Sequence, residues 1–164
     1  MAAPAHRPTP DIRLRAGRPA DLGALVDLER RVFGYDQISR ASFRRLLASP
    51  SAGLIVAEHE HDGAFAGYAL VLFRRRSGIA RLYSIAVANA GLGIGPLLLA
   101  AAEHAARRRR CRVLRLEVHE ANAAAIRRYE RSGYVRRGRR PAYYTDRADA
   151  LRFEKQLAGP SHAP

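Results

Sequence analysis

A glycine-rich segment between a strand pattern and a helix pattern limits the fold of this chain more than any other part of the sequence. The apolar run that ends at Val87 is typical of a strand, and Gly91-Leu-Gly-Ile-Gly95 follows it closely. Pro96 and an alanine-rich stretch come next and end in the arginines at 107–110, which suit a helix C-terminus. A strand, a glycine loop and a helix in this order often hold a pyrophosphate, because glycines let the backbone approach the anion and the N–H groups of the helix point at it.

The glycine segment also has a simpler explanation, since glycines form turns for steric reasons alone. It fits other nucleotide motifs poorly: no Gly-Lys-Ser/Thr follows it as in a P-loop, and its spacing differs from the G-x-G-x-x-G of dinucleotide-binding folds. ATP and NAD are therefore disfavoured as ligands. Pro96 suits the first position of a helix, but it has no N–H group and so removes one donor to a phosphate.

Hydrophobic periodicity predicts the elements on either side of the glycine segment. The Asp62-Gly63 pair lies between two apolar runs and predicts a tight hairpin, while Asn122 and Gly133 mark the start and the stop of a helix. The order β-α-α-β-β-β-α-β-α-β describes an α/β protein whose sheet has mixed strand directions. Strands are expected near residues 12–16, 54–57, 68–73, 81–87, 113–118 and 150–157, and helices near 22–32, 42–48, 96–110 and 122–132.

Length and composition favour one domain. The chain has 164 residues, and a hydrophobic fraction of 48% is enough for one continuous core. We expect this domain to cover residues 11–157, with loose tails at 1–10 and 158–164. The first ten residues lack the apolar stretch of a secretory signal. Because Cys111 is the only cysteine, no internal disulfide forms, and a reducing cytoplasm is the expected location.

Two further classes of protein fit the sequence poorly. The uncharged run at residues 85–102 approaches the length of a membrane span, but several glycines and Pro96 interrupt it, so no membrane segment is expected. His104 and His119 belong to no metal-binding spacing such as H-E-x-x-H, and no metal is expected.

The net charge of +14 concerns partners rather than the fold. A field of this sign attracts the phosphates of a cofactor, an acidic protein or ribosomal RNA. The alternative is that a GC-rich coding bias explains the many alanines and arginines, with many of the arginines on the solvated surface, and both explanations remain open.

Glu117 and Tyr129, which follow the glycine segment in the sequence, are candidates for proton transfer. The strand near 113–118 puts its apolar side chains on one face and leaves Glu117 on the other, where a carboxylate, through a water if needed, is able to take a proton from an ammonium. Position alone favours a simpler role, in which Glu117 pairs with one of the many arginines. In the next helix, Asn122 is a natural N-cap and Tyr129 shares a face with apolar residues, which packing also explains.

Three segments resemble the GCN5-related N-acetyltransferases (GNAT), and within that family the RimI type, which acetylates protein N-termini. They are Tyr83-Ser-Ile-Ala-Val87, the loop Gly91 to Gly95, and Leu116-Glu-Val118 with Asn122-Ala-Ala-Ala-Ile-x-x-Tyr129-Glu-x-x-Gly133-Tyr134. The resemblance covers residues 81–157, while the first half of the chain agrees in element order alone. It implies a mixed, mostly antiparallel twisted sheet of about six to seven strands, flanked by about four helices.

The resemblance implies that acetyl-CoA is the cofactor, that coenzyme A is the product, and that acetyl passes directly to a primary amine in a ternary complex. It places the general base at Glu117 and the acid that protonates the departing thiolate at Tyr129. The family loop usually begins with Arg or Gln, and this chain has Ala90 there, so one phosphate-binding or loop-bracing side chain is absent. The residues implied in cofactor binding are Ile85, Ala86, Val87, Leu92, Gly93, Ile94, Gly95 and Asn122.

Tyr143 and Tyr144 resemble the paired tyrosines near the acceptor peptide of the RimI type, although two adjacent tyrosines in a loop also serve surface packing. The preferred acceptor is the N-terminal α-amine of a protein or peptide, such as a ribosomal protein, and the chain is expected to act as a monomer or homodimer. Two alternatives remain: a small-molecule amine as acceptor, and a non-catalytic basic module that binds coenzyme A or RNA. Ala90 and Pro96 favour the module, whereas Glu117 and Tyr129 favour an enzyme.

Overall fold

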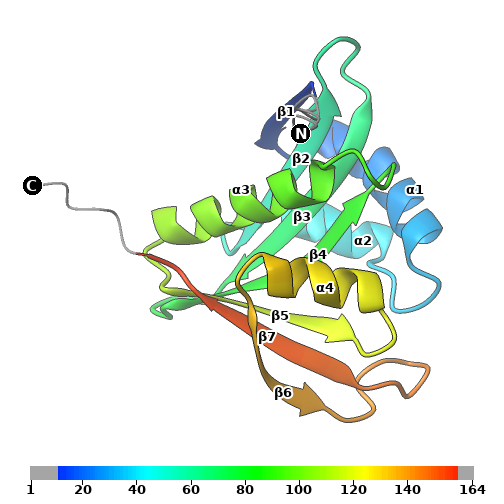
Figure 1. Cartoon of the computed structure of the whole chain (residues 1–164). Helices are drawn as coiled ribbons and strands as arrows, with labels where there is room; N and C mark the ends of the chain where they lie inside the picture. The colour runs from blue at the N-terminus through cyan, green and yellow to red at the C-terminus, as the bar shows by residue number, and fades with distance from the viewer. Residues whose placement is uncertain (1–10, 159–164) are drawn as a thin grey trace, which may run out of the picture.

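A twisted seven-stranded sheet forms the centre of the computed structural model, which describes residues 11–158 (Figure 1). The strands lie in the order β1-β2-β3-β4-β5-β7-β6, and all neighbours are antiparallel except β4 and β5, which are parallel. The predicted α/β fold with a mixed sheet and four α-helices is confirmed. The tail expected at 1–10 lies outside the described residues, as does the tail expected at 158–164 except for its first residue. The strands are β1 Ile12–Ala16, β2 Ala52–His59, β3 Phe65–Phe73, β4 Ile79–Val87, β5 Val113–His119, β6 Val135–Arg140 and β7 Ala150–Gln156, and the helices are α1 Leu22–Val32, α2 Arg40–Leu47, α3 Ile94–Arg108 and α4 Ala123–Arg131.

Helices cover both faces of the sheet, and each face has its own buried cluster. α1 and α2 pack on one face, where Leu25 and Tyr68 are fully buried. α3 packs on the other face against a cluster that contains Leu98 and Leu114. A fully buried leucine contributes about 1.5–3 kcal/mol relative to an exposed one, so these two clusters hold the helices on the sheet.

The local signals for turns and helix ends are confirmed. Gly63, in the turn between β2 and β3, has a φ of 69°, and its N–H donates to the carbonyl of His59 at 2.8 Å. Asn122 caps α4, because its side-chain oxygen accepts from the N–H of Ala125 at 3.2 Å. Gly133 follows α4 with a φ of 87°, a conformation that favours glycine.

The two edges of the sheet differ from what the sequence predicts. β6 was not predicted, because Val-Arg-Arg-Gly-Arg-Arg has no apolar alternation; it is an edge strand that pairs with β7, and its side chains are mostly exposed. β1 is a strand as predicted, but its apolar face is only partly buried: Ile12 packs against the cluster under α3, while Leu14 is 37% exposed. Arg15 turns inward instead, because it pairs with the buried carboxylates of Asp21 at 2.8 Å and Glu58 at 2.7 Å.

Candidate active site

The site begins where β4 and β5 part. Their parallel pairing runs from Ile79 opposite Val113 to Leu82 opposite Leu116, and it stops there. A β-bulge lies at the same level, because the pairs that β3 makes with β4 skip Tyr83. Beyond the bulge the two strands diverge (Figure 1), so the β5-facing backbone edge of residues 84–87 is open to another extended chain.

A cleft of about 1220 Å³ fills this opening. It brings together the predicted residues Glu117, Asn122 and Tyr129 with the tyrosine pair. Leu92 to Gly95 are outside the lining and form the turn at the start of α3. Ile94 is 1% exposed, so its side chain belongs to the core and it offers a ligand only its backbone. The other predicted residues in the lining are Ile85, Ala86 and Val87.

The glycine turn has the geometry of an anion-binding helix N-terminus. Gly91 and Gly93 have φ values of 83° and 76°, and Gly93 is the N-cap of α3. The prediction that Pro96 occupies the first helical position is wrong, because Ile94 and Gly95 precede it within the helix. Pro96 still lies in the first turn, where backbone N–H groups have no intrahelical partner, so the proline costs no helical hydrogen bond.

Arg128 supplies a cation at this turn. A Cβ atom on Gly95 would lie 3.1 Å from Nη1 of Arg128, so the guanidinium packs directly on the glycine. Ala124 and Ala125 precede Arg128 on α4 by four and three residues and line the cleft with it. Ala121, in the turn before α4, also lines the cleft. α4 therefore presents small side chains to the cleft and a positive charge to the glycine turn.

Glu117 lies in a network of arginine and tyrosine. Its side chain is 5% exposed, and its Oε2 accepts from Nε of Arg81 at 3.0 Å. Arg140 approaches its Oε1 at 3.7 Å. Arg81 also donates to the hydroxyl of Tyr143 at 2.6 Å. Burial lowers the pKa of Arg81, but Glu117 and Tyr143 outweigh it and the net pKa is raised. The arginine pairing expected as the simpler role of Glu117 is therefore present, inside the cleft.

Tyr129 is buried at the inner wall of the same cleft. It is 6% exposed, and its ring lies 5.7 Å from that of Tyr134 and 6.4 Å from that of Phe153. Burial raises the pKa of Tyr129 to about 12, although the positive charge of Arg128 opposes the shift. The hydroxyl is therefore protonated throughout the physiological range, which is the state that a proton donor requires.

Two loops far apart in the sequence meet at the outer end of the cleft. Asp36, between α1 and α2, accepts from the N–H and the hydroxyl of Thr145 at 3.0 and 3.1 Å. Tyr35 packs 5.6 Å from His119, and Tyr144 packs 4.9 Å from the same ring. The cleft thus ends in an aromatic rim that both loops build.

The buried carboxylate of Glu29 links α1 to the strands beside the cleft. Glu29 is 2% exposed, and it accepts from the N–H of Ile38 at 2.8 Å and from the hydroxyl of Tyr68. Tyr68 also bonds Ser84 at 2.8 Å, next to the bulge in β4. Burial raises the pKa of Glu29, and the two hydrogen bonds only partly oppose this. The network fixes α1 against the strand that borders the cleft.

Sequence reasoning missed several residues of this cleft. The sequence does contain a signal for Arg128, because Ala124 and Ala125 precede it at helical spacing and so share a helix face with it. Tyr35 and Arg81 carried no such signal, because their partners are distant in the chain; Arg81 and Glu117 are 36 residues apart. The same holds for Arg140, which is outside the lining and approaches Glu117.

Within residues 11–158, no group of three or more His, Cys, Asp or Glu side chains is arranged to hold a metal ion. None of the helices in that range is both long enough and apolar enough to cross a membrane.

The fold and the cleft define a class of protein: an α/β domain with two parted parallel strands, a glycine turn suited to a pyrophosphate, and a carboxylate and a tyrosine in one cleft. The model of the acetyltransferase (GNAT) family matches residues 22–134, and the chain belongs to this family. It is accordingly an N-acetyltransferase of the kind that uses acetyl-CoA. No curated protein sequence matches the chain.

Solved structures show the same fold over nearly their whole length. Ard1 from Thermoplasma volcanium has a TM-score of 0.82 at 23% identity, covering 90% of this chain and 99% of that one. The ribosomal-protein-S18-alanine N-acetyltransferase from Escherichia coli has a TM-score of 0.78 at 26% identity, covering 93% and 98%. The ribosomal-protein-alanine N-acetyltransferase from Brucella melitensis has a TM-score of 0.76 at 27% identity, covering 88% and 99%.

Proposed function

We propose that the chain transfers acetyl from acetyl-CoA to the N-terminal α-amine of a protein or peptide, directly and in a ternary complex. The observation that carries this choice of acceptor is the pairing of Glu117 with Arg81 and Arg140. Similarity to two ribosomal-protein-alanine N-acetyltransferases agrees with it.

The two arginines favour a weakly basic acceptor. Nearby positive charges disfavour a protonated amine, so an incoming amine is more readily neutral and nucleophilic beside them. An α-amine has an ordinary pKa of about 8, whereas the lysine side chain has one of about 10.4, so the α-amine needs much less free energy to lose its proton. The same argument disfavours polyamines, which carry several charges into a positive site.

The chain's own residues fit the cofactor. Gly91, Gly93 and the N–H groups at the start of α3 suit the pyrophosphate, and Arg128 adds a positive charge there. The open edge of Ile85, Ala86 and Val87 suits the amide groups of the pantetheine arm. Acetyl-CoA, when bound, supplies an activated thioester.

Two side chains would move protons. Each carboxylate oxygen of Glu117 has one arginine partner and keeps a free lone pair, so Glu117 would accept a proton from the amine directly or through a water. Tyr129, protonated in the wall of the cleft, would donate to the departing thiolate. Tyr143 and Tyr144, with Tyr35, would contact the first residues of the peptide at the aromatic rim.

The acetylated nitrogen tests this proposal. Two peptides of one sequence, each with an internal lysine, are incubated with the enzyme and acetyl-CoA; one has a free N-terminus and the other is blocked there. Mass spectrometry of fragments is expected to place the acetyl group on the α-amine of the first peptide, with no product from the second. Acetylation of the lysine in both peptides would overturn the proposed acceptor while leaving the acetyltransferase activity intact.

A further inference from the structure

A second hollow lies at the other end of β4 from the glycine turn. It has a volume of about 750 Å³ and lies between the β3–β4 turn and the α3–β5 turn. Pro50 and Ser51 close it on the side of β2. Because the nine residues of β4 are separated by eight rises of about 3.3 Å, the two ends of this strand are about 26 Å apart.

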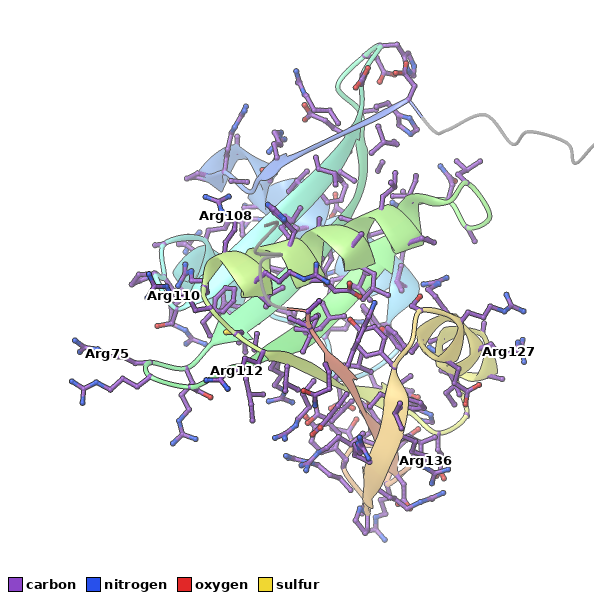
Figure 2. All side chains as sticks on the ribbon, turned by 60° about the vertical axis from the view of Figure 1, so that its left-hand side comes forward. Arg75, Arg108, Arg110, Arg112, Arg127 and Arg136 are labelled. Atoms are coloured by element: carbon purple, nitrogen blue, oxygen red, sulfur yellow. The ribbon has the colours of Figure 1, made fainter. Side chains whose placement is uncertain are left out.

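Exposed arginines surround this hollow. Among residues 11–158 none of the six forms an ion pair, and no carboxylate belongs to the lining. Figure 2 shows Arg75, Arg110 and Arg112 gathered on this side of the molecule, whereas Arg127 and Arg136 lie on α4 and β6. The six are Arg74, Arg75 and Arg76 from one turn and Arg109, Arg110 and Arg112 from the other.

The floor of the hollow is fixed by contacts between the two turns. The N–H of Arg112 donates to the carbonyl of Gly78 at 2.7 Å. Arg109 donates from Nη1 to the carbonyl of Pro50 at 2.8 Å, and its guanidinium lies 4.4 Å from the centre of the Phe73 ring. The positive groups are therefore mounted on a framework that is already organised.

Both turns hold an arginine where glycine would be more stable. Arg76 and Arg110 each have a φ of 59°, in the left-handed region that residues with a Cβ atom disfavour. Arg110 directly follows the C-cap of α3, a position that glycine usually occupies. The chain therefore has arginine at two positions where glycine would give a more stable backbone. Backbone strain of this kind is often found at functional sites.

We propose that this hollow and its six arginines, here called the arginine hollow, bind the phosphodiester backbone of a nucleic acid. Six positive charges without a carboxylate exceed what one phosphate neutralises, and a nucleic acid supplies closely spaced phosphates that guanidinium groups contact in pairs of hydrogen bonds. A protein partner fits less well, because Arg109 already covers Phe73 and the lining offers no other large apolar side chain.

This site does not depend on the proposed acceptor, and it leaves the cleft free. A nucleic acid bound there would lie at the far end of β4, about 26 Å along the strand from the side of the glycine turn. The cleft would then be within reach of substrates that the nucleic acid carries. Acetyl transfer to a free peptide is therefore expected to continue with the arginine hollow occupied.

The test is a titration of fluorescently labelled single-stranded RNA and DNA oligonucleotides, followed by anisotropy over a range of salt concentrations. The variant Arg75→Gln/Arg110→Gln/Arg112→Gln is compared with Arg127→Gln/Arg131→Gln/Arg136→Gln, which removes the same charge elsewhere. The first variant is expected to bind about 100-fold more weakly at about 0.1 M salt and to lose about two units of salt slope, while the second stays close to wild type. Comparing RNA with DNA shows which backbone is preferred.

Three results would overturn the proposal: equal losses in both variants, which would mean diffuse charge; no saturable binding by wild type at about 0.15 M salt; and tighter arginine-dependent binding of polyglutamate than of either oligonucleotide. A further variant, Arg76→Gly/Arg110→Gly, separates binding from folding. It is expected to raise the unfolding temperature and still weaken nucleic-acid binding, which a purely structural role for these arginines would not produce.

Discussion

At the scale of single residues, burial and charge divide the work in the cleft. Tyr129 is buried and stays protonated, because burial raises its pKa to about 12. Glu117 is equally hidden, but Arg81 and Arg140 compensate its negative charge. The guanidinium of Arg128 packs on Gly95 at the glycine turn. Each of these three environments makes a separate prediction about rate or affinity.

Replacing Tyr129 by Phe is expected to lower kcat about 100-fold and to leave the KM for acetyl-CoA nearly unchanged, because the hydroxyl is needed only when the thiolate departs. Coenzyme A release followed with a thiol reagent measures both constants. Tyr134→Phe is the matched control, since that hydroxyl bonds Glu103 at 3.1 Å in the core. An unchanged kcat in Tyr129→Phe would assign the proton donor to another group.

Replacing Arg128 by Gln is expected to weaken coenzyme A binding about tenfold or more, because a charge-assisted hydrogen bond to phosphate contributes about 1.5–3 kcal/mol. Isothermal titration with coenzyme A measures the Kd, and the adjacent exposed Arg127→Gln serves as the control. If both variants bind as wild type does, Arg128 only packs against Gly95.

At the scale of elements, what the sequence predicts well is what local pattern determines. The alternation in β5 and the N-cap of α4 are local, and both appear as predicted. The inward turn of Arg15 depends on Glu58, 43 residues away, and the closure of the outer cleft depends on Asp36 and Thr145, 109 residues apart. No local pattern encodes such pairs. β6 was not predicted because an edge strand tolerates charged, exposed side chains and so needs no apolar alternation.

The ion pairs of β1 predict a dependence of stability on pH. Arg15 lowers the pKa of Asp21, and Arg13 together with Arg15 lowers that of Glu58. Carboxylates with a lowered folded-state pKa stabilise the fold above their unfolded value of about 4, and this stabilisation is lost as the pH falls through the lowered value. Arg15→Gln is therefore expected to lower Tm by several degrees at pH 7 and by less at pH 3.

Thermal unfolding followed by circular dichroism at several pH values measures this difference. Arg44→Gln, an exposed arginine on α2, is the control and is expected to leave Tm unchanged. A Tm difference between Arg15→Gln and wild type that is the same at pH 3 and pH 7 would mean that Arg15 stabilises β1 by packing alone.

At the scale of the whole molecule, the two ends of β4 border two different hollows. One end opens into the cleft with the glycine turn, and the other carries the arginine hollow. The net charge of +14 is therefore unevenly distributed. Part of it lies beside Glu117 and at the glycine turn, and part gathers where no carboxylate lines the surface. The sequence supplied the total charge, but only the fold brings residues 74–76 beside residues 109–112.

The most direct test of the central claim is coenzyme A release from acetyl-CoA across short peptides that differ at residue one, with spermidine and free amino acids alongside. The account predicts saturable release with peptides, selective for the first residue, and little with the small amines. Release with spermidine or amino acids and none with peptides, while acetyl-CoA still binds, would contradict it.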